Sequence, residues 1–213
     1  MNAFAEAEGN SMRSRYTIIR GNGADRERLP ALQLSEILWT PDYGITAEGR
    51  FCHDDRNLYA FLRAGEKEIR AEYTEPFSPV HEDSCLEFFF MPEGESRYLN
   101  FEINPNGCLC LESGTGRHGR ENLFRPELAE TFRIRTGRTA DGWEASFRIP
   151  AEFLECVWPG FRFRGILRAN VYKCGDKTAH PHFLAWRPVG TRTPDFHRPE
   201  FFGEMVFGGR QED

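Results

Sequence analysis

The sequence has no apolar run long enough to span a bilayer as a helix. Its first residues, 1–15, also lack the apolar core of a secretory signal, so we expect a cytoplasmic protein without a membrane partner. Six cysteines are scattered without the density of a disulfide framework, which indicates reduced, partly buried thiols. P-loop, dinucleotide-binding and Ser/His/Asp motifs are missing as well. These absences leave no common catalytic signature to follow.

The chain is also not basic. Its net charge of −6 and isoelectric point near 5.6 argue against nucleic acid as a partner. Hydrophobic residues make up 39% of the chain, and 19 phenylalanines supply much of the aromatic content. This composition suits a folded protein with an aromatic β-rich core.

Helical periodicity is scarce, whereas short strand-like runs recur between turns rich in Gly, Pro, Asn and Asp. Outside one central hairpin, the predicted strands are Tyr16–Arg20, Asn57–Arg63, Cys108–Glu112, Phe132–Thr136, Trp143–Ile149, Phe161–Tyr172, Phe183–Trp186 and Glu204–Phe207. A short helix is predicted to open at 150–154, because proline is favoured in a first turn. The segment 113–129 is predicted to be a long loop.

This pattern predicts an all-β fold: an antiparallel β-sandwich, jelly-roll-like, in a single domain. We place that domain at residues 15–208, with a flexible N-terminal segment at 1–14 and a flexible tail at 209–213.

The central hairpin joins residues 85–90 to residues 98–104 and sorts its side chains by chemistry. Alternation sends one set toward the core: Leu86, Phe88, Phe90, Leu99, Phe101 and Ile103. The opposite face carries Glu87, Glu102 and Asn104. Since a shift of one residue would separate the apolar sets, the pairing should bring Glu87 opposite or diagonal to Glu102. Such a polar sheet face suits a polyhydroxylated ligand.

The strand predicted over 161–172 would add Arg168 and Asn170 to this face. An arginine among carboxylates would hold them ionised, so neither glutamate should have the raised pKa of a general acid. We therefore expect a non-catalytic site. Two alternatives stay open, a structural ion-pair network and a glycosidase acid/base pair formed by Glu87 and Glu102.

Aromatic and metal-ligating residues give weaker signals. An exposed Trp186 could stack on the apolar face of a pyranose, although a core tryptophan is the ordinary alternative. The motif His180-Pro181-His182 lacks the ligand count of a zinc site, so metal ligands stay unassigned. We expect no cofactor, and a structural Ca²⁺ remains an alternative without a supporting loop motif.

Several blocks, in this order along the chain, resemble the family 9 carbohydrate-binding modules and their family-9-like relatives. The blocks are Asn57–Phe61, Glu82–Phe89, Asn100–Asn104 with Gly107, Arg168–Tyr172, Trp186–Pro188 and Asp195–Gly203. The resemblance implies a β-sandwich that binds mono- or oligosaccharides without catalysis, often as an accessory module of xylan-degrading enzymes. It links the protein to carbohydrate metabolism and polysaccharide breakdown, with a saccharide as its partner.

In that family the sugar lies between two tryptophans, and a Glu, an Arg and an Asn hold its hydroxyls. By motif, the resemblance places the Glu on Glu87, the Asn on Asn104 and one Trp on Trp186. The second Trp falls near His81 and the Arg falls on Glu102, so these two positions depart from the pattern. Arg168 would restore the lost charge from a neighbouring strand.

Two other function classes stay open beside carbohydrate binding. The chain could be an interaction or structural β-sandwich that has lost the sugar site, which the missing second tryptophan favours. It could also be a saccharide-active hydrolase, which depends only on the neighbouring carboxylates.

Overall fold

The computed structural model describes residues 15–210. Its strands are β1 (Arg15–Arg20), β2 (Leu32–Gln33), β3 (Glu36–Ile37), β4 (Thr46–His53), β5 (Asn57–Gly65), β6 (Cys85–Pro92), β7 (Tyr98–Ile103), β8 (Leu109–Gly114), β9 (Glu121–Asn122), β10 (Arg135–Arg138), β11 (Gly142–Pro150), β12 (Ile166–Cys174), β13 (Phe183–Ala185) and β14 (Gly203–Arg210). The helices are α2 (Pro126–Phe132) and α3 (Ala151–Val157), with 3₁₀ turns η1 (Arg26–Arg28), η2 (Val80–Glu82) and η3 (Pro199–Phe201). Strands hold 42% of the residues and helices 10%, which confirms the mostly β class.

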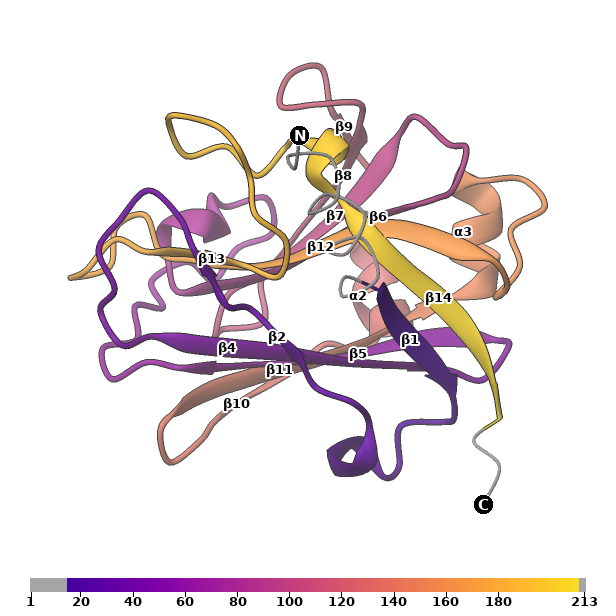
Figure 1. Cartoon of the computed structure of the whole chain (residues 1–213), viewed down its shortest axis with the longest axis horizontal. Helices are drawn as coiled ribbons and strands as arrows, with labels where there is room; N and C mark the ends of the chain where they lie inside the picture. The colour runs from indigo at the N-terminus through magenta and orange to yellow at the C-terminus, as the bar shows by residue number, and fades with distance from the viewer. Residues whose placement is uncertain (1–14, 211–213) are drawn as a thin grey trace, which may run out of the picture.

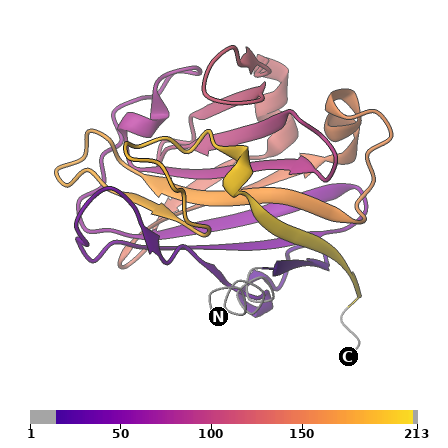
Figure 2. The same cartoon turned by 45° about the horizontal axis from the view of Figure 1, so that its top comes forward.

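The strands form one continuous sheet that curls into two facing layers (Figures 1 and 2). Its path runs β10-β11-β5-β4-β1-β14-β12-β6-β7-β8-β9. The lower layer in Figure 1 contains β4, β5, β10 and β11, and the upper layer contains β6, β7, β8 and β12. At one side of the molecule, β1 and β14 connect the two layers.

The sheet is mixed, which corrects the expectation of a purely antiparallel sandwich. β1 pairs in parallel with both β14 and β4, whereas the other described pairings are antiparallel. Parallel neighbours need a crossover connection, which the chain between β1 and β14 supplies. Local alternation carries no information about this long-range pairing, so the sequence pattern could not reveal it.

The segments expected to be flexible are largely outside the described residues, namely 1–14 and 211–213. β14 extends to Arg210, two residues past the domain end expected at residue 208. Within the described chain, no helix is long and apolar enough to cross a membrane.

β4 is a strand that the sequence pattern did not predict. Ala47, Gly49 and Phe51 face inward on it, and the small residues Ala47 and Gly49 are weak strand formers. Glycine is needed at position 49, because an added Cβ would lie only 2.9 Å from the Phe51 ring and 3.2 Å from Leu62. Close packing inside the curled sheet therefore explains the unusual composition of this strand.

Two predicted strands start several residues later than expected. β12 begins at Ile166 and not at Phe161, because Gly165 adopts a left-handed φ of 78° that breaks the extended run. Phe132 ends helix α2, Arg133 has a φ of 49°, and β10 begins at Arg135.

The segment 113–129, expected to be a loop, contains β9 and the start of α2. The helix expected after Pro150 is present as α3.

The main hydrophobic core lies between the two layers. All six side chains predicted from the hairpin are fully buried there: Leu86, Phe88, Phe90, Leu99, Phe101 and Ile103. Phe101 on β7 stacks on Phe147 of β11, with ring centroids 5.5 Å apart and planes 9° from parallel. Phe51 on β4 meets Phe88 on β6 at 4.8 Å. Aromatic contacts thus join the two layers across the core.

A second hydrophobic cluster covers the outer face of the upper layer. It includes Phe89 and Tyr172 from the strands and Phe196 and Val189 from the loops after β13. The face predicted to be polar is therefore enclosed and not solvated. Five of its polar side chains are buried, whereas Arg168 is partly exposed; the buried ones are Glu87, Asn100, Glu102, Asn104 and Asn170.

A buried charge network links Lys173 on β12 to Glu66, which follows β5, and to His182, which precedes β13. The Lys173 ammonium lies 3.1 Å from the Glu66 carboxylate and 2.6 Å from Nε2 of His182. Trp143 Nε1 and the Ser84 hydroxyl donate hydrogen bonds to the two oxygens of Glu66, at 2.5 and 3.0 Å. Burial lowers the pKa of His182 to about 4, so this ring stays neutral beside the lysine.

Replacing Phe101 tests the core between the layers. Phe101→Ala should lower the free energy of unfolding by about 3–5 kcal/mol, because it removes a fully buried ring and leaves a cavity. Urea denaturation measures the change. Ile37→Ala, at a position 42% exposed, is the control and should cost less than about 1 kcal/mol. Equal losses in both variants would contradict this assignment of the core.

Candidate functional site

Glu87 on β6 and Glu102 on β7 lie directly opposite each other in the sheet. This confirms the pairing predicted from the hairpin. Both side chains point to the outer face, where the covering loops leave them 2% and 4% exposed. Two carboxyl groups therefore form the floor of a cavity that is partly open to solvent.

Burial changes the protonation of both carboxyl groups. It raises the pKa of Glu87 well above its ordinary range, and the nearby Glu102 raises it further. Burial also raises the pKa of Glu102 to about 7, against the opposing effect of the Arg120 charge. The pair thus carries protons near neutral pH, so its oxygens can donate hydrogen bonds as well as accept them.

The prediction that Arg168 lies beside these glutamates was wrong. Arg168 pairs with Met91 on β6, whereas Tyr172, four residues further along β12, pairs with Glu87. Four residues of strand correspond to about 13 Å. Arg168 instead donates a hydrogen bond to the Phe202 carbonyl at 2.5 Å and lies 3.8 Å from Glu204. The expectation of ionised glutamates fails for this reason.

Arg120, which follows β8 in the chain, lines the same cavity, and its charge lowers the pKa values of both Glu87 and Glu102. Its guanidinium donates to the Glu112 carboxylate, with Nε at 2.8 Å, and also contacts the His197 ring. Burial, together with the charges of Arg120 and Arg117, lowers the pKa of His197 to about 2, so the ring is neutral. Tyr98 Oη lies 2.8 Å from Nδ1 of that ring.

Aromatic side chains form a wall above the carboxyl floor. Trp39 contacts Phe183 and Phe196, with ring centroids 5.5 Å apart in each pair. Its indole Nε1 donates to the Thr191 carbonyl at 2.8 Å, which fixes the ring. Phe183 and Phe196 are 6.0 Å apart and nearly perpendicular. The wall is therefore assembled from β13 and two separate loops.

The floor and the aromatic wall border a partly open cavity of about 400 Å³, within the usual range for small-molecule sites. Besides Glu87 and Glu102, it is lined by Trp39, Phe77, Ser78, Pro79, His81, Cys110, Glu112, Arg117, Arg120, Cys174, Asp176, Phe183, Pro194, Asp195, Phe196 and His197.

Of the residues predicted for a site, Glu87, Glu102 and His81 line this cavity. Asn104 does not: its amide donates to Asp83 and to the Tyr73 carbonyl, and its oxygen accepts two backbone N–H groups. Asn170 exchanges hydrogen bonds with the Arg187 backbone at 2.9 and 3.0 Å. Both amides thus hold the backbone in place.

Trp186 also lies outside the cavity lining. It is half-buried against the main core, and the Arg187 guanidinium lies 5.8 Å from its ring centroid. The tryptophan that reaches the cavity is Trp39, which the residue patterns did not single out. Trp39 lies outside every predicted strand, and Arg120 lies in the segment 113–129, which is predicted to be a loop. No local sequence pattern therefore pointed to either residue as part of a site.

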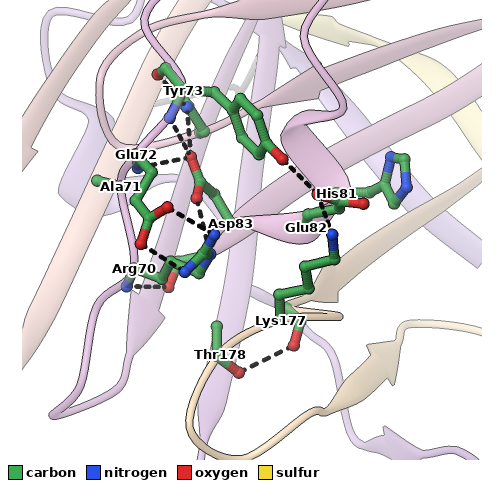
Figure 3. A network of polar contacts seen from close by, with 12 residues as sticks. Arg70, Ala71, Glu72, Tyr73, His81, Glu82, Asp83, Lys177 and Thr178 are labelled. Carbon is green, nitrogen blue, oxygen red and sulfur yellow. Dashed lines mark hydrogen bonds and ion pairs between the residues drawn. The ribbon is translucent and has the colours of Figure 1, made fainter.

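Asp83 anchors the loop that carries His81 (Figure 3). One Asp83 oxygen accepts hydrogen bonds from the backbone N–H groups of Glu72 and Tyr73, at 3.0 and 2.9 Å. Its other oxygen lies 3.3 Å from Nε of Arg70. Figure 3 shows the His81 ring turned away from this network. The network fixes one border of the cavity and leaves His81 available to a ligand.

The fold and the cavity together define a β-rich protein that has an aromatic-walled cavity, lined by carboxyl groups, on the covered face of a sheet. The chain belongs to carbohydrate-binding family 9, whose model matches residues 21–207.

Solved structures agree with this fold. A candidate carbohydrate-binding protein from Bacteroides uniformis is 28% identical, with a TM-score of 0.79 over 92% of this chain and 99% of that one. A family 9 module from Caldicellulosiruptor kristjanssonii in complex with glucose has a TM-score of 0.65 at 14% identity, over 93% and 98% of the two chains. A structure from the same organism with cellotriose gives 0.61 at 15%, over 93% and 95%.

Curated relatives include the UPF0462 protein C4orf33 homolog of Rattus norvegicus, 28% identical over 137 residues. The human UPF0462 protein C4orf33 is 26% identical over 140 residues. Each alignment covers 62% of this chain, and 63% of the relative, so the match spans less than two thirds of either relative's length.

The raised pKa of Glu102 predicts a specific pH dependence of stability. The folded protein holds a proton on Glu102 up to about pH 7, whereas the unfolded chain releases it near pH 4.5. Stability should therefore fall as pH rises through this window, and Glu102→Gln should remove up to about 3 kcal/mol of that fall. The variant should match wild type near pH 4 and exceed it at pH 8.

Urea denaturation at several pH values tests this prediction. Glu95→Gln, at an exposed position, is the control and should follow the wild-type curve. A Glu102→Gln curve that stays parallel to wild type from pH 4 to 8 would contradict the buried, protonated state.

Proposed function

We propose that this protein binds a mono- or oligosaccharide without catalysis in the cavity between Trp39 and the Glu87–Glu102 pair. The observation that supports this most strongly is the combination of an aromatic wall and a protonated carboxyl floor in one cavity. A pyranose has C–H faces that pack on aromatic rings and a rim of hydroxyls that needs donors and acceptors.

Each part of the cavity has a matching role in this proposal. Trp39, with its indole held by the Thr191 carbonyl, stacks on one face of the sugar ring. Glu87 and Glu102 exchange hydrogen bonds with adjacent hydroxyls, which a protonated pair can both donate and accept. His81 and Arg120 border the same space, so they contact the remaining hydroxyls or an acidic group on the sugar.

Family membership and the sugar-bound structures of related modules support the ligand class. The family resemblance further favours oligosaccharides released during polysaccharide breakdown, xylan fragments among them. Glucose, cellotriose and a xylo-oligosaccharide are therefore the first ligands to test.

Trp39 and Trp186 make a matched pair for that test. Trp39→Ala should weaken saccharide binding by about tenfold or more, because an aromatic contact contributes about 0.5–1.5 kcal/mol beyond its buried area. Trp186→Ala should leave the affinity unchanged, since that ring lies outside the cavity. Isothermal titration calorimetry measures both. Loss of binding in Trp186→Ala with full binding in Trp39→Ala would move the site to the other tryptophan.

Hydrolysis of a glycoside is the second candidate, favoured by the raised pKa values of two facing carboxyl groups. Such enzymes need one carboxyl protonated and the other ionised, so their pKa values must be pushed apart. Here burial raises both. We therefore expect no turnover of aryl-glycosides or oligosaccharides, and activity that disappears in Glu87→Gln would assign hydrolysis instead.

A further inference from the structure

Two cysteines and a glutamate meet at the edge of the cavity. Cys85 on β6 lies directly opposite Cys174 on β12, and Glu87 shares the outer face of β6 with Cys85. The two sulfur atoms and one Glu87 oxygen all lie within 4.8 Å of one another. The Cys174 thiol donates to Oε1 of Glu87 at 2.9 Å. All three side chains are buried, and both cysteines are free thiols.

We propose that Cys85, Glu87 and Cys174 bind Zn²⁺ or a similar thiophilic divalent ion. Zinc takes cysteine sulfur and carboxylate oxygen in a tetrahedral shell, at about 2.3 Å for sulfur and 2.0–2.2 Å for oxygen. Three donors within 4.8 Å of one another can reach these distances by small side-chain rotations. The sulfur atoms select against Ca²⁺ and Mg²⁺, which prefer oxygen ligands.

The cavity supplies both an entry path and a fourth ligand position. Glu87 and Cys174 line the cavity, whereas Cys85 does not. An ion arriving through the cavity therefore meets Glu87 and Cys174 first and keeps one open position toward the cavity. Water or the facing Glu102 would fill that position.

Binding of the ion must displace protons. Burial raises the pKa of Cys85 to about 12 and that of Cys174 well above its ordinary range, so both thiols are protonated without metal. A divalent ion replaces the two thiol protons and the Glu87 proton, which pass to solvent, up to about three per ion. The resulting site carries one net negative charge, and Arg120 borders the same cavity.

This inference does not depend on the proposed saccharide binding, because the metal is measured without a sugar present. The full chain is reduced, stripped with a chelator and titrated with Co²⁺ and Zn²⁺. Co²⁺ should produce a thiolate charge-transfer band and intense visible bands of a tetrahedral site. Chelator competition gives the Zn²⁺ affinity.

Three variants identify the ligands. Cys85→Ser and Cys174→Ser each remove one metal ligand, so they should weaken Zn²⁺ binding by more than the about 10–100-fold that loss of an outer-shell partner costs, and reduce the charge-transfer band. Glu87→Gln, which keeps the side-chain shape, should weaken it by about 10–100-fold. Cys156→Ser is the control, since Cys156 is an exposed thiol on α3 that belongs neither to the cluster nor to the cavity lining, and it should bind as wild type does.

The outcomes separate this proposal from its alternatives. Circular dichroism identifies any variant that fails to fold. If a cysteine variant does not fold, the Zn²⁺ affinity of Glu87→Gln is the result that tests the proposal. The proposal is overturned if wild-type protein binds Zn²⁺ no better than Glu87→Gln does. It is also overturned if wild-type protein gives no thiolate charge-transfer band with Co²⁺. A disulfide between Cys85 and Cys174 that forms in the presence of excess Zn²⁺, detected by mass spectrometry, would contradict the proposal as well.

Discussion

The pairing of β6 with β7 is the constraint on which the cavity depends. Alternation along the strands means that the register which buries Phe88 opposite Phe101 also forces Glu87 to face Glu102. A shift of one residue would expose the aromatic core, so hydrophobic burial holds the two carboxyl groups together against their mutual repulsion. Protonation relieves that repulsion, and the carboxyl pair becomes a neutral hydrogen-bonding floor.

The loops over the outer face turn this floor into a site. Phe183 and Phe196 pack into the second hydrophobic cluster, and Asp83 fastens the segment that leads to His81. These contacts exclude water from much of the sheet face, which raises the carboxyl pKa values, and they leave a partly open cavity beside the tryptophan. The same exclusion of water keeps Cys85 and Cys174 protonated, so one covered face carries both the proposed saccharide cavity and the proposed thiol ligands.

Local alternation was enough to predict the hairpin, its core side chains and the facing glutamates, because each depends on residues close together in the sequence. It failed for Arg168, which has the predicted orientation but lies about 13 Å along the strand from the residue that pairs with Glu87. It also failed for Trp39 and Arg120. Both are placed by segments whose position over the sheet depends on contacts far away in the sequence.

The sequence by itself determined a mostly β chain, the inward set of phenylalanines and the polar character of one sheet face, since period-two patterning encodes which side of a strand a residue occupies. Only the tertiary structure decided which strands are neighbours, that β1 joins the layers through parallel pairing, and that Trp39 and not Trp186 borders the carboxyl pair. It also brought Cys85 and Cys174 together across β6 and β12, because the order of strands in a sheet is fixed by packing of the whole chain and not by any local pattern.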